Sequence, residues 1–402
     1  MKTVIRSTTA LTTAHGLGYL ISLAEVPVLA RSLGQTAYGE LVWVQATALL
    51  ASILVDYGFN LSASRGIATR KDNSNFLRQL CGDVFIAKLL LLVIITLPLL
   101  ITYLIFTPVS VGMFIAGFLY FLGFGFTPFW YFQGIEKMGR AVAVETLTRA
   151  ISLLALLLFV KSPEDKTLGL TIMAVGSVTS TTATIVMCRV AVGQFNGSIK
   201  GAIKQLKNST PFFVYKSSGQ LMSSAATTML GSIAGNATVG IFSPAEKVVK
   251  AVCGLALPVF HAFYPHLSSL FIANRQQKNQ QSILLVVFVT GAGLMAAISL
   301  TFIGPTIMHS LLGPGFDAVD DLMVVMVWLI PLRLLNQTLG FAVLLPAGIE
   351  HQAGNAALLS SVLSLGFGTY LAMQFGAIGM VIGMLIGEIV LVTVQLWLCN
   401  KS

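Results

Sequence analysis

Charged residues that lie inside apolar stretches are the residues of this sequence with the most specific chemistry. The basic ones are Arg149, Lys216, Lys247, Lys250 and Arg333, and the acidic ones are Glu25, Glu145, Glu246, Glu388 and, at a margin, Asp56. A charge near the centre of a bilayer is costly, so such residues usually face a bundle interior or a water-filled cavity. Lysine and arginine can replace water around an anion there, and arginine contacts a phosphate through two parallel hydrogen bonds. These residues therefore predict an anion-binding cavity.

Four of these charges are spaced so that they can pair within one helix. Glu145 and Arg149 are four residues apart, as are Glu246 and Lys250, and opposite charges at this spacing attract each other on a helix. Lys216 lies close to the expected inner boundary of its apolar stretch, from which its amine could reach lipid phosphates. If they take part in binding, Lys216 and Arg149 are expected nearer to the cytoplasmic side.

Lys247 and Arg333 have no acidic residue at a helical spacing. Lys247 shares a helical face with Lys250, and Arg333 lies near the middle of its apolar stretch. We therefore expect Lys247, Lys250 and Arg333 to contact an anionic ligand. The alternative is that these cations brace the bundle by pairing with Glu25 or Glu388 on facing helices.

The embedded carboxylates could instead bind a proton or a metal cation, as buried acids in pumps do; the candidates are Glu25, Glu388 and Asp56. Enzyme motifs are missing. The sequence contains no GxxxxGK[ST], HExxH or GxSxG motif, and its four cysteines show no CxxC spacing. We therefore expect no enzymatic activity, no cofactor and no bound metal as part of the protein.

Composition indicates which elements must position these charges. Hydrophobic residues make up 55% of the 402 positions and charged residues 10%, and the mean hydropathy is +0.85, whereas a soluble domain has about 25% charged residues. An apolar stretch of about 20 residues spans a bilayer as a helix. Twelve such stretches run over residues 8–30, 38–59, 82–106, 110–132, 141–160, 167–188, 211–234, 239–267, 282–308, 319–345, 354–374 and 377–398. The sequence predicts an all-α membrane protein with no separate soluble domain.

Basic residues are distributed unevenly between the expected loops. If the amino terminus is cytoplasmic, sixteen Lys and Arg residues, Lys88 among them, lie at inward ends and loops, and three lie in outward loops. This bias places both termini on the cytoplasmic side. It also accounts for the net charge of +9, so no nucleic-acid partner is expected, and Arg65 and Arg70 are expected to be topological anchors.

Two short patterns recur in corresponding loops of the two halves. LGQTAYG at 33–39 returns as AGNATVG at 234–240, and QGIEKMG at 133–139 returns as AGIEHQAG at 347–354. Because the patterns recur in the same order, the chain is expected to form two pseudo-symmetric six-helix bundles around a central cavity. The expected bundles are residues 1–200 and 201–402.

One polar interruption between apolar stretches, residues 128–141, is expected to be a cytoplasmic turn. Gly134 would permit the tight turn, and Trp130 and Tyr131 would lie in the interfacial aromatic belt. The same residues also carry a family resemblance.

The stretch PFWYFQGIEKM, residues 128–138, resembles the P-x-W-[FY]-[FY]-Q-G-x-E-K-M signature of the bacterial polysaccharide flippases. These are the O-antigen transporters of the multidrug/oligosaccharidyl-lipid/polysaccharide exporter superfamily. LARSLGQTAYGE at 29–40 and VDYGFNLSASR at 55–65 are similar to that family's first loop and to the end of its second helix. The second half of the chain matches only in pattern.

This resemblance implies a cargo and a route. The cargo would be an oligosaccharide linked to undecaprenyl pyrophosphate, moved by alternating access from the cytoplasmic to the periplasmic leaflet of the bacterial inner membrane. The implied partners are the lipid bilayer and a polymerase and chain-length regulator of the same pathway. One alternative is a multidrug exporter of the same superfamily that moves organic cations, which should expose unpaired acids. Another is a different membrane component of polysaccharide assembly, such as a polymerase.

Overall fold

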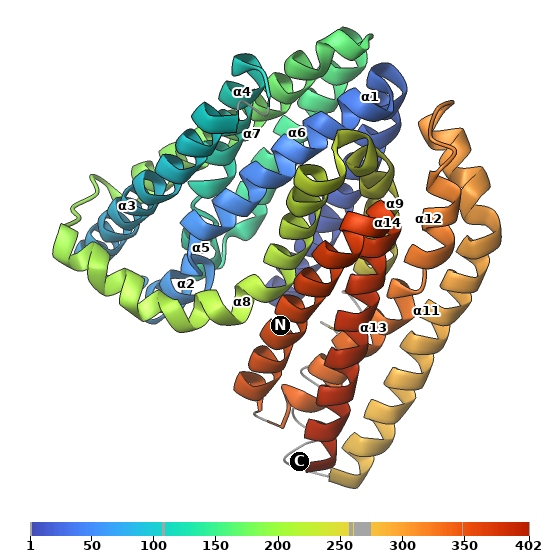
Figure 1. Ribbon diagram of the computed structural model, residues 1–402. Coiled ribbons are helices and arrows are strands. Elements are labelled where there is room, and N and C mark those ends of the chain that lie inside the picture. Colours follow the sequence, from blue (N-terminus) through green and yellow to red (C-terminus); the bar gives the residue numbers. More distant parts are fainter. Residues whose placement is uncertain (1, 107–108, 257–259, 261–274, 348, 402) are drawn as a thin grey trace. The chain divides into compact units, whose positions relative to one another are not determined.

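The computed structural model describes residues 2–106, 109–256, 260, 275–347 and 349–401 (Figure 1). Side chains are described in these ranges except at residues 2–17, 19, 214–221, 275–279, 350 and 400–401. Within the described part of the chain all regular structure is helical. The prediction of an all-α protein is confirmed.

The chain forms two compact units, of which unit 1 comprises residues 1–33 and 41–224 and unit 2 comprises residues 34–40 and 225–402. The helices of unit 1 are α1 (Lys2–Asp56, apart from 34–40), α2 (Phe59–Thr69), α3 (Ser74–Phe106), α4 (Val111–Gly125), α5 (Phe129–Gly134), α6 (Met138–Phe159), α7 (Lys166–Val192) and α8 (Ile199–Ala234, up to residue 224), with a 3-10 turn at Pro163–Asp165. Those of unit 2 are α9 (Asn236–Gly254), α11 (Arg275–Leu312), α12 (Val319–Met326), α13 (Leu329–Leu339), a π-helical segment (Gly340–Leu344) and α14 (Glu350–Lys401). The two symmetric bundles with a boundary at residue 200 stay a prediction.

Eight helical stretches among the described residues are long and apolar enough to cross a membrane. Two of them, Leu20–Thr69 and His351–Cys399, are 50 and 49 residues long. A helix of that length measures roughly 75 Å, against about 30 Å for the hydrocarbon core of a bilayer. Gly34 (φ 70°) interrupts the first stretch and Gly376 (φ 57°) the second, so each is long enough for two crossings. The count of twelve spans stays a prediction.

Several observed helix boundaries differ from the predicted ones. The predicted first loop remains helical except at Gly34. The helix predicted to start at Pro211 begins earlier, at Ile199, so Pro211 lies inside α8. The predicted helix 319–345 is divided into α12, α13 and the π-helical segment. Part of the predicted helix 239–267 lies outside the described residues, and α9 ends at Gly254. Proline inside a membrane helix is tolerated where neighbours satisfy the freed carbonyl, which a sequence pattern does not reveal.

The two segments that carry the first repeated pattern contact each other within unit 2. A Cβ atom added at Gly39 would lie 1.8 Å from the carbonyl oxygen of Asn236, and one added at Gly240 would lie 2.2 Å from that of Gln35. Each segment therefore presents a glycine to the backbone of the other, at positions 201 residues apart. The glycines recur because only hydrogen fits at this approach.

The stretch 128–138, which carries the family resemblance, folds largely as α5, and its aromatic side chains are buried. Trp130 and Tyr131 are 0% and 4% exposed and pack with residues of α2, α3 and α7. The predicted interfacial belt is therefore wrong for these two residues, since belt residues contact lipid head groups. A Cβ at Gly134 would lie 2.6 Å from the Cβ of Ile67, so this glycine allows α5 to approach α2. The turn itself follows at Glu136, which has φ 59°.

Candidate functional site

Unit 2 holds a buried carboxylate that two side chains of α13 contact. Arg333 donates through Nε to Oε1 of Glu388 on α14 at 3.1 Å, and Asn336 donates through Nδ2 to Oε2 at 2.6 Å. Residues three apart on a helix lie on one face, which is why both reach the same carboxylate. Arg333 and Glu388 are 14% and 12% exposed. The pairing with a facing helix is the bracing arrangement that the sequence left open.

The helix α9 adds further charges to the same unit. Glu246 is 5% exposed and pairs with Lys250, which is 38% exposed, at 2.9 Å. Glu246 also lies near enough to Arg333 to interact with it electrostatically. Lys247 is half-buried and makes no ion pair with any residue whose side chain the structure describes. The predicted pair between Glu246 and Lys250 is confirmed.

Unit 1 contains the second predicted pair within a helix. Arg149 and Glu145 on α6 lie 2.6 Å apart, which confirms that prediction. The guanidinium of Arg149 lies 5.7 Å from the centre of the Phe124 ring on α4. Glu25 on α1 and both members of the pair lie within electrostatic range of the hydroxyl of Tyr120. Arg149 therefore belongs to a polar group formed by α1, α4 and α6.

A cross-helix ion pair in unit 1 corrects one prediction. Lys88, expected at an inward-facing end, is 0% exposed, and its ammonium lies 3.2 Å from Oδ1 of Asp56. The same ammonium donates to the carbonyl of Gly125 at 2.8 Å, and Asn60 donates to Oδ2 of Asp56 at 2.7 Å. No local pattern indicates this pair, because 32 residues separate Lys88 from Asp56. The pair joins the ends of α1 and α4 to α3.

The remaining predicted site residue is Lys216 on α8. It lies among residues whose side chains the structure does not describe, so its role stays a prediction. In the described part of the chain, no cluster of three or more His, Cys, Asp or Glu residues could hold a metal ion.

The family model for the polysaccharide biosynthesis protein family matches residues 4–271. The chain belongs to this family. A candidate O-antigen transporter of Shigella dysenteriae is 28% identical over 390 residues, which cover 95% of this chain and 96% of the relative. A candidate O-antigen transporter of Escherichia coli K12 is 27% identical over 415 residues, covering 99% and 97%. The resemblance drawn from residues 128–138 is confirmed.

Solved structures establish the fold of this polysaccharide biosynthesis protein. The lipid II flippase MurJ in an inward closed conformation has a TM-score of 0.76 at 14% identity, covering 99% of this chain and 88% of that one. An inward-facing multidrug resistance transporter of the MATE family has a TM-score of 0.70 at 15% identity, covering 95% of each chain. The protein thus has the same fold as the MurJ flippase and the MATE transporter. It is a multi-pass protein of the bacterial inner membrane. Because both curated relatives are described as transporters, the expectation that it is not an enzyme is confirmed.

Sequence reasoning missed one contact in unit 2 of this polysaccharide biosynthesis protein. Asn336 is 5% exposed and binds Glu388 through both the side chain and the carbonyl oxygen, the latter at 3.2 Å. A signal existed, since Asn336 follows Arg333 by three residues and an amide in an apolar helix needs a partner. A search limited to charged residues does not find it.

Proposed function

We propose that this protein is a flippase that moves an oligosaccharide repeat unit of O-antigen, linked to undecaprenyl pyrophosphate, from the cytoplasmic to the periplasmic leaflet by alternating access. The observation that carries the proposal is the match to two candidate O-antigen transporters over at least 95% of this chain. The fold agrees, because the MurJ structure is named as a flippase of another lipid-linked molecule. The bilayer and the lipid-linked glycan are accordingly its immediate partners.

The charges of unit 2 support an anionic cargo. Taking an ion of carboxylate size from water into a dielectric of about 4 costs on the order of 20 kcal/mol, so a diphosphate needs cations along its path. Lys247, Lys250 and Arg333 are the residues that we propose contact the diphosphate or acidic sugars, with Lys216 and Arg149 nearer to the cytoplasmic side. Within the two embedded pairs, Glu246–Lys250 and Arg333–Glu388, Lys250 is the most accessible member, at 38% exposed.

The embedded acids give little support to an exporter of organic cations. Each has a partner, namely Arg333 for Glu388, Lys250 for Glu246, Arg149 for Glu145 and Lys88 for Asp56, and Glu25 also takes part in an interaction. A cationic drug would have to displace one of these cations. A coupling proton or metal ion at Glu388 or Asp56 would face the same competition.

The proposal includes the arrangement expected from the sequence. It places twelve spans in two six-helix bundles around a cavity, with both chain ends in the cytoplasm, as the distribution of basic residues favours. A polymerase and a chain-length regulator would act on the delivered glycan. Cysteine substitution in the loops with a membrane-impermeant thiol reagent tests the topology directly.

Complementation tests the function. The full chain is expressed in a bacterium that lacks its own polysaccharide flippase but makes the glycan of this protein's own gene cluster, and surface glycan and lipid-linked intermediate are both measured. We expect restored surface glycan and loss of the accumulated intermediate. Continued accumulation with correctly inserted protein would overturn the proposal. Substitution of Lys250 or Arg333 in the same assay tests the proposed cation contacts. Lys200→Gln, which removes a cation from the exposed start of α8, serves as the matched control.

A further inference from the structure

A basic pocket of about 400 Å³ opens between α2, the start of α3 and α8 in unit 1. Arg65 and Arg70 from the end of α2 and Lys204 from α8 line it. Phe76 and Phe212 supply apolar surface in the same lining. Cations beside aromatic rings suit a ligand that is anionic at one end and apolar at the other.

The walls of the pocket are held at a fixed spacing by contacts between α2 and α8. The hydroxyl groups of Ser62 and Ser209 lie 2.6 Å apart. Tyr57, which precedes α2, stacks on Phe213 with ring centres 4.7 Å apart. A Cβ atom added at Gly58 would lie 2.6 Å from the backbone nitrogen of Phe213, so the two segments touch through their backbones. The cations therefore project from a packed support, which lowers the cost of ordering them around a ligand.

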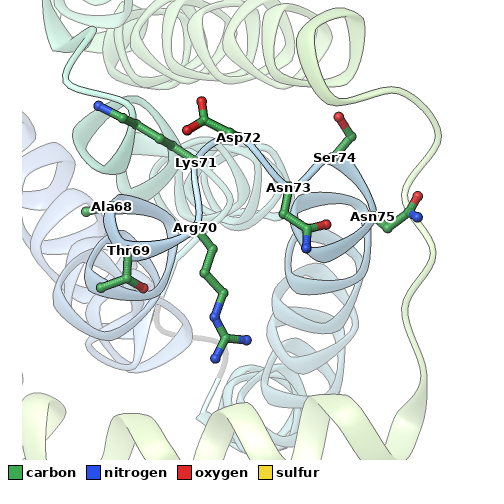
Figure 2. Close-up of a pocket in the computed structure, with 8 residues that line it drawn as sticks. All are labelled: Ala68, Thr69, Arg70, Lys71, Asp72, Asn73, Ser74 and Asn75. Carbon is green, nitrogen blue, oxygen red and sulfur yellow. The ribbon is translucent and has the colours of Figure 1, made fainter.

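The turn after α2 directs its charges to different sides. Figure 2 shows Arg70 extending from the turn on the side opposite to Lys71 and Asp72. The guanidinium carbon of Arg70 lies 4.9 Å from the centre of the Phe76 ring. Arg70 also lines a neighbouring pocket of about 660 Å³ formed by residues 68–75, so it stands where the two pockets meet.

The charge of the pocket is not balanced from within. None of its lining residues is acidic, and Arg65, Arg70 and Lys204 make no ion pair with any residue whose side chain the structure describes. By contrast, the guanidinium of Arg78 at the start of α3 donates to the carbonyl of Val192 at 3.0 Å. Three like charges around one pocket repel one another, so an anion between them is stabilising. A topological anchor requires no such convergence.

We propose that this pocket binds the phosphate or diphosphate head group of a membrane lipid and serves as a cytoplasmic loading site for the cargo. Guanidinium groups match phosphate through paired hydrogen bonds, and basic pockets between membrane helices are known to hold lipid head groups. The site is separate from Lys247, Lys250 and Arg333. Its role in loading rests on the proposed function, whereas its affinity for a lipid phosphate does not.

Native mass spectrometry of the purified full-length protein in detergent tests the site. The probes are undecaprenyl diphosphate, phosphatidylglycerol, phosphatidylcholine and inorganic pyrophosphate. The pocket variant is Arg65→Gln/Arg70→Gln/Lys204→Gln. The matched control, Lys137→Gln/Lys200→Gln/Lys207→Gln, removes the same charge from exposed positions outside the pocket. The pocket variant has no cationic donors left for the diphosphate, so it loses the charge-assisted hydrogen bonds. We therefore expect it to bind undecaprenyl diphosphate at least about tenfold more weakly, while the control stays close to wild type.

The outcomes separate the sources of the phosphate. Competition by inorganic pyrophosphate in the wild type would assign recognition to the head group alone, and its failure to compete would assign it to head group and chain together; either supports a lipid site. Equal weakening in both variants would reduce the effect to general surface charge and overturn the proposal, as would unchanged binding by a folded pocket variant. If the pocket variant loses lipid binding while the wild type fails to complement, the lipid-phosphate site stands, and the proposed function falls together with the loading role.

Discussion

The two units each bring together a cation and a carboxylate from different helices, but they hold them in different ways. In unit 1 the ammonium of Lys88 is 0% exposed and contacts both Asp56 and the carbonyl of Gly125. In unit 2 Arg333 and Glu388 keep 14% and 12% of their side-chain surfaces exposed. The ammonium of the first pair also contacts a third helix, while its carboxylate partner Asp56 keeps 20% of its side-chain surface exposed. We expect this pair to brace the helix ends.

The second pair has charged neighbours that a ligand could reach. The helices α9 and α13 pack against each other, and α9 carries the half-buried Lys247 and the more exposed Lys250. Lys250 is more exposed than Arg333, at 38% against 14%. Lys88 is the more deeply buried cation, yet its contacts are those expected of a brace, so the burial of a charge is not by itself a sign of a transport site.

The largest expected effect on stability comes from breaking the pair between Lys88 and Asp56. Lys88→Met removes the ammonium but keeps an unbranched side chain that is only one atom shorter, and it leaves the carboxylate of Asp56 without its ion-pair partner. Breaking a buried ion pair from one side costs about 3–5 kcal/mol. We expect a loss of unfolding free energy of that size, measured by denaturant unfolding in detergent.

A second variant distinguishes the pair from simple packing. Lys88→Met/Asp56→Asn removes both charges, so it should recover most of the lost stability, because a neutral amide does not require a cation. If Lys88→Met unfolds at the wild-type denaturant concentration, the pair is no brace and the contrast between the units disappears.

Arg333→Gln tests the role of the pair between Arg333 and Glu388. Lys88→Met also leaves the carbonyl of Gly125 without its ammonium donor, whereas Arg333→Gln affects only Glu388, which keeps its hydrogen bond from Asn336. The stability loss should therefore be smaller than for Lys88→Met. A charge-assisted hydrogen bond to a phosphate contributes about 1.5–3 kcal/mol, and we expect surface glycan export to fall at least about tenfold. Arg333→Lys should recover only part of the export, because lysine lacks the paired donors. Export at the wild-type level in both variants would show that Arg333 only braces α13 against α14.

A double variant can likewise show whether Lys250 contacts the cargo or only neutralises Glu246. Lys250→Gln leaves Glu246, which is 5% exposed, without its helical partner. If Lys250 only neutralises Glu246, the double variant Lys250→Gln/Glu246→Gln should restore export. If Lys250 contacts the cargo, the double variant should remain as defective as the single one, which is our expectation. Export assays on membranes with equal protein content decide between them.

The parts of this fold that depend on neighbours in the sequence could be predicted. The apolar stretches indicated the helices, and the i,i+4 spacing indicated the pairs at Glu145 and Glu246, because these contacts are set within one helix. The repeated glycines marked a real contact, although its partner, the other repeat, became visible only in space. The resemblance at residues 128–138 indicated the family.

The sequence could not decide the contacts between helices, although it offered Glu388 as one possible partner of Arg333. Asp56 pairs with Lys88 and Glu388 with Arg333 across 32 and 55 residues, and nothing in local spacing selects those partners. Trp130 was misplaced for a related reason: an aromatic residue beside a polar turn is typical of the membrane interface, but here α2 and α3 cover it. In each case the outcome depended on which helix packs alongside.

The smallest expected effect is on the pair at Glu145 and Arg149, and it sets the scale for the others. Both side chains are partly exposed, at 25% and 31%, and the pair forms within one helix. Pairs of this kind contribute about 0.3–0.5 kcal/mol. A double-mutant cycle with Glu145→Gln and Arg149→Gln, measured by denaturant unfolding, should give a coupling energy near that value. The same cycle at Asp56 and Lys88 should give a coupling several times larger, because there the partners lie on different helices and one is fully buried. Equal couplings would mean that the way a pair is built, within a helix or between helices, does not decide its contribution to stability.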